Sequence, residues 1–256
     1  MFLLVTPAHN EADNVQGLVD CVAASTLRPD LWVVVDDRST DDTAARFEAA
    51  KGDLPLLVVP SGTSGGYMGF RYSEVVRAGI DAARGRLGDL AFFGILDCDI
   101  RFQPDYWASL AGVLRADPEL GIVSGALCSP DERGRMVIEG GQRIDLPRGG
   151  LRLTTGACFS AIDGFARSRA PDSVATVRAK TAGWRTALLE EHIAWSVRPT
   201  DSRGEDESGW ESRGRRAWNI GQPPWQVGLR AVWVGGRGQR RAAQSLVQGY
   251  RDERQH

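Results

Sequence analysis

The chain has 256 residues, of which 42% are hydrophobic and 25% charged, and its formal net charge is -2. These values are typical of a globular protein with one large domain, or one domain and an appendage, and they exclude a general nucleic-acid binder, which carries a basic excess. The charge is unevenly distributed, because residues 210–256 hold nine arginines and three acids whereas residues 1–209 hold 22 basic and 30 acidic residues.

The cysteine spacing and the short apolar N-terminal run bear on the compartment. Cysteines 21, 98, 128 and 158 have no spacing typical of a zinc site or a redox motif, which predicts a reducing environment. The run "FLLV" is too short for a secretory signal, and no segment approaches about 18 consecutive apolar residues. We therefore expect a cytoplasmic protein that meets a membrane, if at all, peripherally on the inner face of the cell membrane.

Short apolar runs alternate with amphipathic helical segments through the first half of the chain. Runs that are apolar almost throughout are typical of strands in a parallel sheet that helices cover on both faces. The runs are Phe2–Thr6, Leu31–Val35, Leu56–Val59, Leu90–Leu96 and Gly121–Ala126, and the helical segments are 15–23, 39–50, 72–85 and 105–116. The alternation predicts an α/β fold with a mainly parallel sheet.

The second half has a different pattern. Residues 129–155 combine Gly, Arg and Pro with short alternating runs, which predicts a hairpin or meander. A helix is expected from about Asp172 to Ala182, ended by Gly183, and residues 200–209 read as a polar loop.

Polar clusters follow three of the predicted strands: "TPAHNE", "DDRSTDD" and "DCD". Ligands of open α/β sheets bind beyond the carboxyl ends of the strands, so these clusters are expected to form one site. Along an extended segment Asp97 and Asp99 face one side and Cys98 the other. Two carboxylates on one side favour a shared cation, and their hard oxygens favour Mg²⁺ or Mn²⁺, which also bind substrate phosphates. The alternative is a turn in which both aspartates accept hydrogen bonds from backbone amides.

Five segments, in this order, carry a resemblance: "VTPAHNEADNV", "VVVDDRSTDDT", "RAGIDAARG", "GILDCDIRFQPD" and "GACFSAIDGF". They resemble the family-2 nucleotide-sugar glycosyltransferases of the GT-A fold, over roughly residues 2–190. The resemblance implies an inverting, metal-dependent enzyme that moves a sugar from a nucleotide-diphosphate sugar of UDP or GDP type to a hydroxyl acceptor, a glycan or a lipid-linked molecule. It also implies a GT-A (Rossmann-like) domain over 1–200, with a nucleotide-sugar half at 1–127 and an acceptor half at 128–200, followed by a basic extension at 201–256.

The resemblance assigns the donor site residue by residue. It implies that the nucleotide pocket is bordered by Pro7, Ala8, Asn10 and Glu11. Asp37 would contact the base, and Arg71 would lie near the donor. In the Asp-x-Asp motif, Asp97 would lie near the ribose or diphosphate. Asp99, together with Asp97, would hold Mn²⁺ or Mg²⁺. Each has a structural alternative: Asn10 could cap the first helix, Asp36 is the structural member of its pair, and Arg71 could be a solvated residue at a helix start.

The catalytic base is expected from the same resemblance. Family members carry it in a Glu-Asp pair after a Gly-Gly-Phe-like segment, at a helix start. Here Gly164 and Phe165 are followed by Asp172, which is preceded by Pro171 instead of Glu. Asp172 is therefore the predicted base. Its alternative is a helix N-cap, with Glu190 and Glu191 as replacement bases.

Neither His9 nor His192 is expected to be catalytic. His9 lies where the family often has an aromatic residue, which favours stacking or packing near the base. His192 could be a third metal ligand, but a lone histidine near a strand end is more often structural. The chain has no Gln-x-x-Arg-Trp motif, which favours transfer of a single sugar over processive synthesis.

Tryptophans 210, 218, 225 and 233 recur every seven or eight residues among the arginines of the tail. Breaks at Gly221, Pro223 and Pro224 predict two amphipathic helices. Tryptophan with arginine suits the interface of an anionic membrane, where a polyprenyl-linked acceptor would lie. Packing of the tail on its own domain, or on a second copy in a homodimer, explains the pattern equally well.

Two rival functions stay open at this point. A sugar-phosphate nucleotidyltransferase would carry a Gly-rich, Arg/Lys-containing signature after the first strand, where this chain has "PAHNEADN". A protein that binds a nucleotide sugar or a partner without turnover is kept open by the altered Glu-Asp pair.

Overall fold

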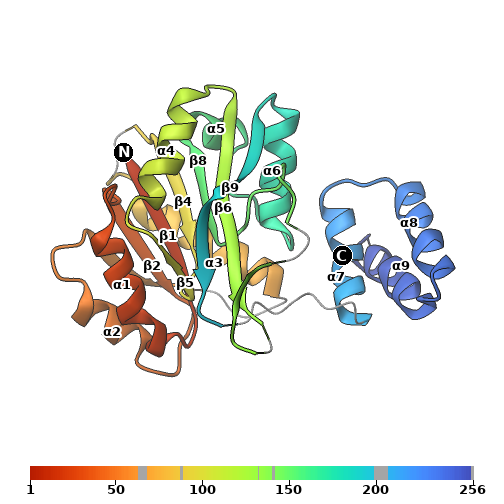
Figure 1. Cartoon of the computed structure of the whole chain (residues 1–256), viewed down its shortest axis with the longest axis horizontal. Helices are drawn as coiled ribbons and strands as arrows, with labels where there is room; N and C mark the ends of the chain where they lie inside the picture. Colours follow the sequence, from red (N-terminus) through yellow and green to blue (C-terminus); the bar gives the residue numbers. More distant parts are fainter. Residues whose placement is uncertain (63–67, 87–88, 132, 140–141, 199–206, 255–256) are drawn as a thin grey trace.

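The computed structural model describes residues 1–62, 68–86, 89–131, 133–139, 142–198 and 207–254 (Figure 1). In these residues the strands are β1 Phe2–Ala8, β2 Leu31–Asp36, β3 Leu56–Pro60, β4 Phe92–Leu96, β5 Ile100–Phe102, β6 Leu120–Pro130, β7 Met136–Ile138, β8 Leu151–Thr155 and β9 Arg185–Ser196. The helices are α1 Val15–Ala24 (after a 3₁₀ turn, Ala12–Asn14), α2 Thr43–Ala50, α3 Met68–Ala83, α4 Tyr106–Ala116, α5 Gly156–Ala161, α6 Pro171–Thr181, α7 Glu207–Asn219, α8 Pro224–Gly236 and α9 Arg240–Arg254.

The strands form one mixed sheet in the order β3-β2-β1-β4-β8-β6-β9-β5, with β7 paired to β6 at the side. The predicted parallel part is present, since β1 pairs in parallel with β2 and β4, and β2 pairs in parallel with β3. The second half adds antiparallel pairs, because β8 returns between β4 and β6 and runs against both. The α/β class and the helices on both faces are thus confirmed.

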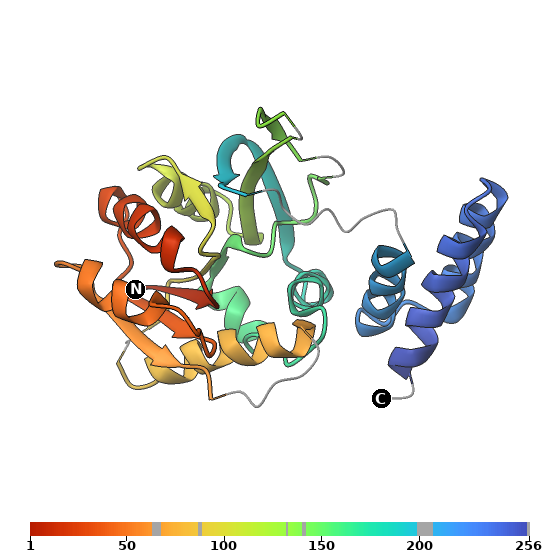
Figure 2. The ribbon, with the colours of Figure 1, turned by 90° about the horizontal axis from the view of Figure 1, so that it is seen from below.

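Alternation along the strands explains the two helical layers. In β1, Phe2 and Leu4 point into a core shared with α1, α2 and α4, whereas Leu3 and Val5 point into a core shared with α3 and the α5 segment. Figure 2 shows these helices on opposite sides of the sheet. Gly79 lets α3 lie close to the sheet, because a Cβ there would be 2.6 Å from a methyl carbon of Val5.

Several local predictions are corrected. The helical segment expected at 39–50 starts later, since α2 begins at Thr43 after its N-cap Asp42, whose side chain makes no capping hydrogen bond. The expected helix from Asp172 starts one residue earlier, at Pro171, and Gly183 follows it with a φ of 90°. Most of the polar loop expected at 200–209 lies outside the described residues.

The tail forms a bundle of three helices, α7, α8 and α9, where the sequence predicted two. The expected break at Gly221–Pro224 is present, and a second break at Gly238 separates α8 from α9. The bundle has its own core, formed by Trp210, Ala217, Val227, Val234, Ala242, Leu246 and Tyr250. No helix in the described part of the chain is long and apolar enough to span a membrane.

Candidate active site

The predicted polar clusters meet at one edge of the sheet. β1 and β2 end in register, with Ala8 opposite Asp36, and β4 pairs with the other side of β1. The backbone amide of Asp37 donates to the carbonyl of Ala8 at 2.7 Å, which joins the first two clusters directly. Pro7 reaches the third cluster, since its carbonyl accepts from Cys98 Sγ at 3.5 Å. Cys98 is buried and points away from Asp97 and Asp99 into the core, as the strand alternation predicted.

Asp37 forms the centre of a buried polar group. Its Oδ1 accepts from Ser61 Oγ at 2.9 Å, and its Oδ2 accepts from Nε of Arg71. Arg71 also donates to the Asp37 carbonyl at 3.0 Å, so it is a fixed partner of Asp37 and not a solvated residue at a helix start. His9 Nδ1 lies 2.8 Å from the same carbonyl. Asp36 interacts only weakly with the turn, accepting from the Ser39 amide at 3.4 Å.

Asn10 holds the first two loops together and does not cap a helix. Its backbone has a φ of 54°, in the left-handed region that asparagine tolerates better than most residues. Its side-chain Oδ1 accepts from the backbone amide of Thr40 at 2.8 Å, and its backbone amide donates to Ser39 Oγ at 3.0 Å. The capping alternative for Asn10 is therefore wrong, because the N-cap of α1 is Asn14.

An arginine that is distant in sequence lies between two acidic side chains of the site. Nε of Arg198, just after β9, donates to Asp99 Oδ2 at 2.9 Å, and its Nη2 donates to Glu11 Oε1. Glu11 is buried and also accepts from Asn14 at 2.7 Å. The pKa of Arg198 is raised: burial lowers it, but the hydrogen bond to Glu11 and the negative charge of Asp99 outweigh that effect. The positive charge beside Asp99 in this structure is therefore the guanidinium of Arg198.

Asp97 has other partners than Asp99. Its Oδ1 accepts from the hydroxyl of Tyr72 at 3.3 Å, and its amide donates to the carbonyl of Gly150 at 2.8 Å. Burial, followed by the charges of Asp99 and Asp172, raises the pKa of Asp97 from 3.8 to about 7. A second cation near Asp97 would favour its ionised form.

The tertiary structure brings Asp172 next to Asp97. Both carboxylates pack against the segment before β8, since a Cβ on Gly149 would lie 2.4 Å from Asp172 Oδ2 and a Cβ on Gly150 would lie 1.9 Å from Asp97 Oδ2. Arg152, 2% exposed, donates to the carbonyl of Asp172 at 3.1 Å, and its Nη2 lies 3.7 Å from Asp172 Oδ1. The N-cap alternative for Asp172 is wrong, because Ala170 is the N-cap and Asp172 lies in the first turn of α6.

The replacement bases and the histidine considered as a ligand lie on β9. Glu190, Glu191 and His192 occupy an irregular stretch of β9 between the residues that pair with Gly125 and Ala126. Both glutamates are exposed, and the ion pair that His192 makes is with Glu191, at 3.8 Å.

The acidic residues fit a divalent cation that takes the rest of its ligands from a substrate. Within the described residues, no group of three or more His, Cys, Asp or Glu side chains is arranged to hold an ion. Mg²⁺, however, is usually held by one or two carboxylates together with waters and substrate phosphates. Asp97 and Asp99 meet that requirement, and Arg198 already provides a positive charge at Asp99.

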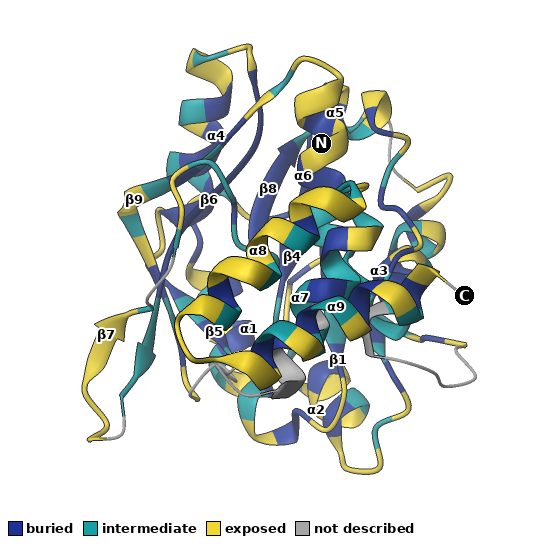
Figure 3. Ribbon diagram, turned by 90° about the vertical axis from the view of Figure 1, so that its right-hand side faces the viewer, coloured by how far each residue is buried: buried dark blue, intermediate teal, exposed yellow. Residues whose placement is uncertain are grey.

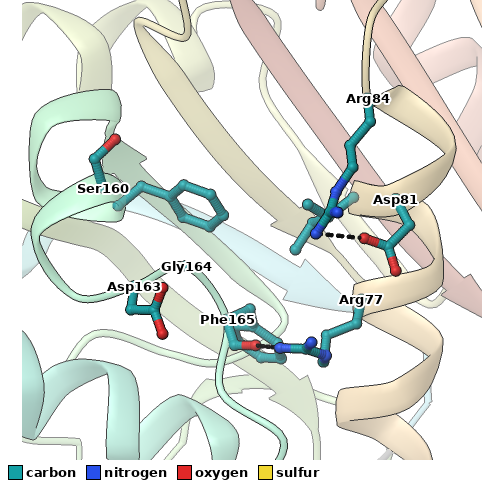
Figure 4. Close-up of a pocket in the computed structure, with 9 residues that line it drawn as sticks. Arg77, Asp81, Arg84, Ser160, Asp163, Gly164 and Phe165 are labelled. Atoms are coloured by element: carbon teal, nitrogen blue, oxygen red, sulfur yellow. Dashed lines mark hydrogen bonds and ion pairs between the residues drawn. The ribbon is translucent and has the colours of Figure 1, made fainter.

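A surface pocket lies away from this site. It is formed between α3 and the segment around α5, and Figure 4 shows Arg77 and Arg84 on one wall and Ser160 and Asp163 on the other. None of the site residues predicted from the sequence lines it. The donor site is therefore assigned from the convergence of the acidic side chains and not from this pocket.

Sequence reasoning missed Arg198, Tyr72 and Arg152. Nothing distinguishes Arg198 and Arg152 among the 29 arginines of the chain, and Tyr72 reads as part of a helical face. The only usable signal was the pair Gly149-Gly150, which could have indicated a place where side chains pack tightly against the backbone.

An α/β sheet with polar side chains gathered at the carboxyl ends of its parallel strands has the place where open α/β proteins bind their ligands. Residues 3–172 match the model of glycosyl transferase family 2. This match covers about two thirds of the chain, and the chain therefore belongs to glycosyl transferase family 2. No match was found among curated proteins.

Solved structures agree with the fold. A mannosyltransferase of Pyrobaculum calidifontis, in complex with GDP-Man and Mn²⁺, is 18% identical, with a TM-score of 0.62, 86% of this chain covered and 62% of that chain. TarS 1–349 of S. aureus, in complex with UDP-GlcNAc, is 17% identical, with a TM-score of 0.62 and coverages of 84% and 65%. Glucosyl-3-phosphoglycerate synthase of Mycobacterium tuberculosis, in complex with Mn²⁺, UDP and glucosyl-3-phosphoglycerate, is 18% identical, with a TM-score of 0.60 and coverages of 87% and 81%.

These similarities support the GT-A arrangement of the sheet and helices. The present chain spans less than two thirds of the length of the mannosyltransferase and of TarS 1–349. The activities of those proteins are therefore not transferred to this chain.

Proposed function

We propose that the chain is a metal-dependent, inverting, non-processive glycosyltransferase that moves one sugar from a UDP- or GDP-type donor to a hydroxyl acceptor. The observation that carries this proposal is the convergence of Asp97, Asp99 and Asp172 at one edge of the sheet. Membership of family 2 speaks against the nucleotidyltransferase alternative.

The donor half of the site contains residues that would recognise the nucleotide and two aspartates that would bind the metal ion. In the proposed complex, Pro7, Ala8, Asn10 and Glu11 border the nucleotide. Asp37 accepts a hydrogen bond from the base, and Arg71, already paired with Asp37, keeps that carboxylate in place. Asp97 and Asp99 would hold Mn²⁺ or Mg²⁺, which when bound stabilises negative charge on the departing nucleoside diphosphate.

Asp172 is the proposed base. Within the described residues its Oδ1 accepts no hydrogen bond, although Nη2 of Arg152 lies 3.7 Å away, so this oxygen can accept from the hydroxyl of an acceptor. As the acceptor oxygen bonds to the anomeric carbon, the bond from that carbon to the diphosphate oxygen breaks, and the hydroxyl proton passes to Asp172. Arg152 keeps the first turn of α6 in position through the Asp172 carbonyl.

The tail is proposed to be a separate appendage to a catalytic domain of residues 1–200. Its own hydrophobic cluster supports that division, and its basic charge supports peripheral association with the inner face of the cell membrane, near a lipid-linked acceptor.

The test separates donor binding from turnover. UDP-, GDP- and dTDP-sugars are screened for thermal stabilisation with and without Mn²⁺, and Asp99→Ala should abolish the part that depends on Mn²⁺. Asp172→Asn should keep donor-dependent stabilisation but lower kcat by about 10²- to 10⁴-fold. Glu190→Gln, at an exposed position on β9, is the matched control and should keep wild-type turnover.

Three outcomes would contradict the proposal. A Mn²⁺-dependent shift that persists in Asp99→Ala removes Asp99 as a ligand. Full turnover in Asp172→Asn removes Asp172 as the base. Donor binding without transfer to any hydroxyl acceptor in the wild type would favour the non-catalytic alternative.

A further inference from the structure

Helix α8 has two apolar faces, and only one of them is covered. Val227 and Val234 are buried in the core of the bundle, where Ala231 packs beside them. The opposite face carries Trp225, Leu229, Val232 and Trp233, which are 63%, 63%, 75% and 56% exposed. Their spacing of four, three and one residues places them on one stripe of the helix. Such a stripe of large exposed side chains is unusual and indicates a binding surface.

The structure changes which residues of the tail form this surface. The sequence pattern grouped four tryptophans, but Trp210 is buried in the bundle and Trp218 packs edge-on against Tyr250, with ring centroids 5.4 Å apart. Trp210 therefore belongs to the bundle core, and Trp218, 37% exposed, packs on the edge of that core. The other two, Trp225 and Trp233, join Leu229 and Val232 in a continuous exposed face.

Among the residues that the structure describes, none covers this face. The bundle contacts the catalytic domain through the end of α7, where Asn219 accepts from Ser168 Oγ at 2.9 Å, and through α9, where Glu253 pairs with Arg169 at 2.7 Å. α8 lies on the side of the bundle away from the sheet, and in Figure 3 it faces the viewer with its exposed residues outward (Figures 1 and 3).

The surroundings of the face are basic. Residues 220–250, which include α8, contain four arginines and no aspartate or glutamate. Arg237 lies over the ring of Trp233, with its guanidinium carbon 3.6 Å from the ring centroid, and Arg240 is exposed at the start of α9. An apolar helix face with tryptophans and a basic border is the pattern of helices that lie in the interface of anionic membranes.

We propose that α8 lies flat in the headgroup region of an anionic bilayer, with Trp225, Leu229, Val232 and Trp233 in the acyl boundary and Arg237 and Arg240 near lipid phosphates. Tryptophan suits this depth because its ring is apolar and its N–H can remain hydrated. A second copy of the chain fits less well, since a two-fold contact through α8 would bring two basic borders together.

The test uses the full chain and co-sedimentation with phosphatidylcholine vesicles that contain or lack phosphatidylglycerol. The wild type should bind the anionic vesicles at least about tenfold more strongly than the neutral ones. The double variant Trp225→Ser/Trp233→Ser should lose at least about tenfold of that binding, and Arg237→Gln/Arg240→Gln should weaken it and reduce its dependence on salt. Because these positions are exposed, circular dichroism and Tm should stay close to wild type.

The matched control is Met136→Ser/Ile138→Ser in β7, which removes two exposed apolar side chains, 49% and 60% exposed, from another surface. It should bind like the wild type. Equal loss in this control, unchanged binding of the tryptophan variant, or no preference for anionic vesicles would overturn the proposal. So would a dimer in sedimentation velocity that the tryptophan substitutions dissociate. Vesicle binding needs no turnover, so failure of the proposed activity would leave this result intact.

Discussion

Replacement of Arg198 by alanine tests the charge balance of the candidate site. Arg198 is half exposed, but its two partners are not: the side chains of Glu11 and Asp99 are 10% and 17% exposed. Without the guanidinium, two nearly buried carboxylates face the site with no cation beside them. The metal-free protein should therefore be less stable, and Asp99 should become available to a metal ion.

The magnitude follows from the exposure of the pair. Two unit charges about 4 Å apart interact by about 4 kcal/mol at an effective dielectric constant of about 20. Exposure of Arg198 to solvent reduces this to about 1–2 kcal/mol. The free energy of unfolding should fall by that amount in metal-free buffer, which corresponds to a Tm lower by about 2–8 °C. If Mn²⁺ competes with Arg198 for Asp99, the same energy lowers the Kd for Mn²⁺ by about 5- to 30-fold in Arg198→Ala.

The assay is urea unfolding in the presence of EDTA, followed by titration of Mn²⁺ measured by its electron paramagnetic resonance signal. Arg185→Ala is the matched control, because Arg185 also pairs with two acids, Asp117 and Glu119, at a more exposed position outside the site. That control should leave the Kd for Mn²⁺ unchanged. Weaker or unchanged Mn²⁺ binding by Arg198→Ala would refute the reasoning and would mean that Arg198 and the ion do not compete for Asp99.

Two further predictions concern Asp97. A Cβ at Gly150 would lie 1.9 Å from Asp97 Oδ2, so Gly150→Ala should lower the free energy of unfolding by about 1–3 kcal/mol and weaken Mn²⁺-dependent donor binding in thermal shift. In the control Gly112→Ala, where the new Cβ would have no atom within 4 Å, both quantities should stay as in the wild type. The pKa of Asp97, raised from 3.8 to about 7, means that the native state binds more protons than the unfolded state between these values, so stability falls as pH rises through that window. In metal-free urea unfolding, Asp97→Asn should show a smaller loss of stability between about pH 4 and 7, by at most about 4 kcal/mol, and equal pH slopes would contradict the shift.

The acidic clusters also show where sequence reasoning reached its limit. Asp37, Asp97 and Asp99 could be placed at one edge of the sheet because parallel strands all end on the same side, and the strands were recognisable as unbroken apolar runs. The proximity of Asp172 to Asp97 depends on β8, which runs antiparallel between β4 and β6 and brings Gly149 and Gly150 against both carboxylates. Local pattern carries no information on where such a returning strand inserts.

The tail shows the same division. Its composition predicted helices and a break near Pro223, because proline and glycine act on their own backbone. It could not separate Trp210, which is buried in the bundle, and Trp218, which packs on Tyr250, from Trp225 and Trp233, which are more than half exposed, because all four recur at a similar spacing. Which face of each helix is covered depends on the neighbouring helices.

The sequence by itself determined the family, the parallel half of the sheet and the acidic strand ends, since these depend on motifs and on periodicity along a few residues. The tertiary structure alone decided that the cation beside Asp99 is Arg198, 99 residues further along the chain. It also decided that Asp172 lies beside Asp97 and that α8 exposes its second apolar face. The physical reason is that a contact between distant segments is set by the packing of the whole sheet or bundle, and the residues that make it have no common pattern in the chain.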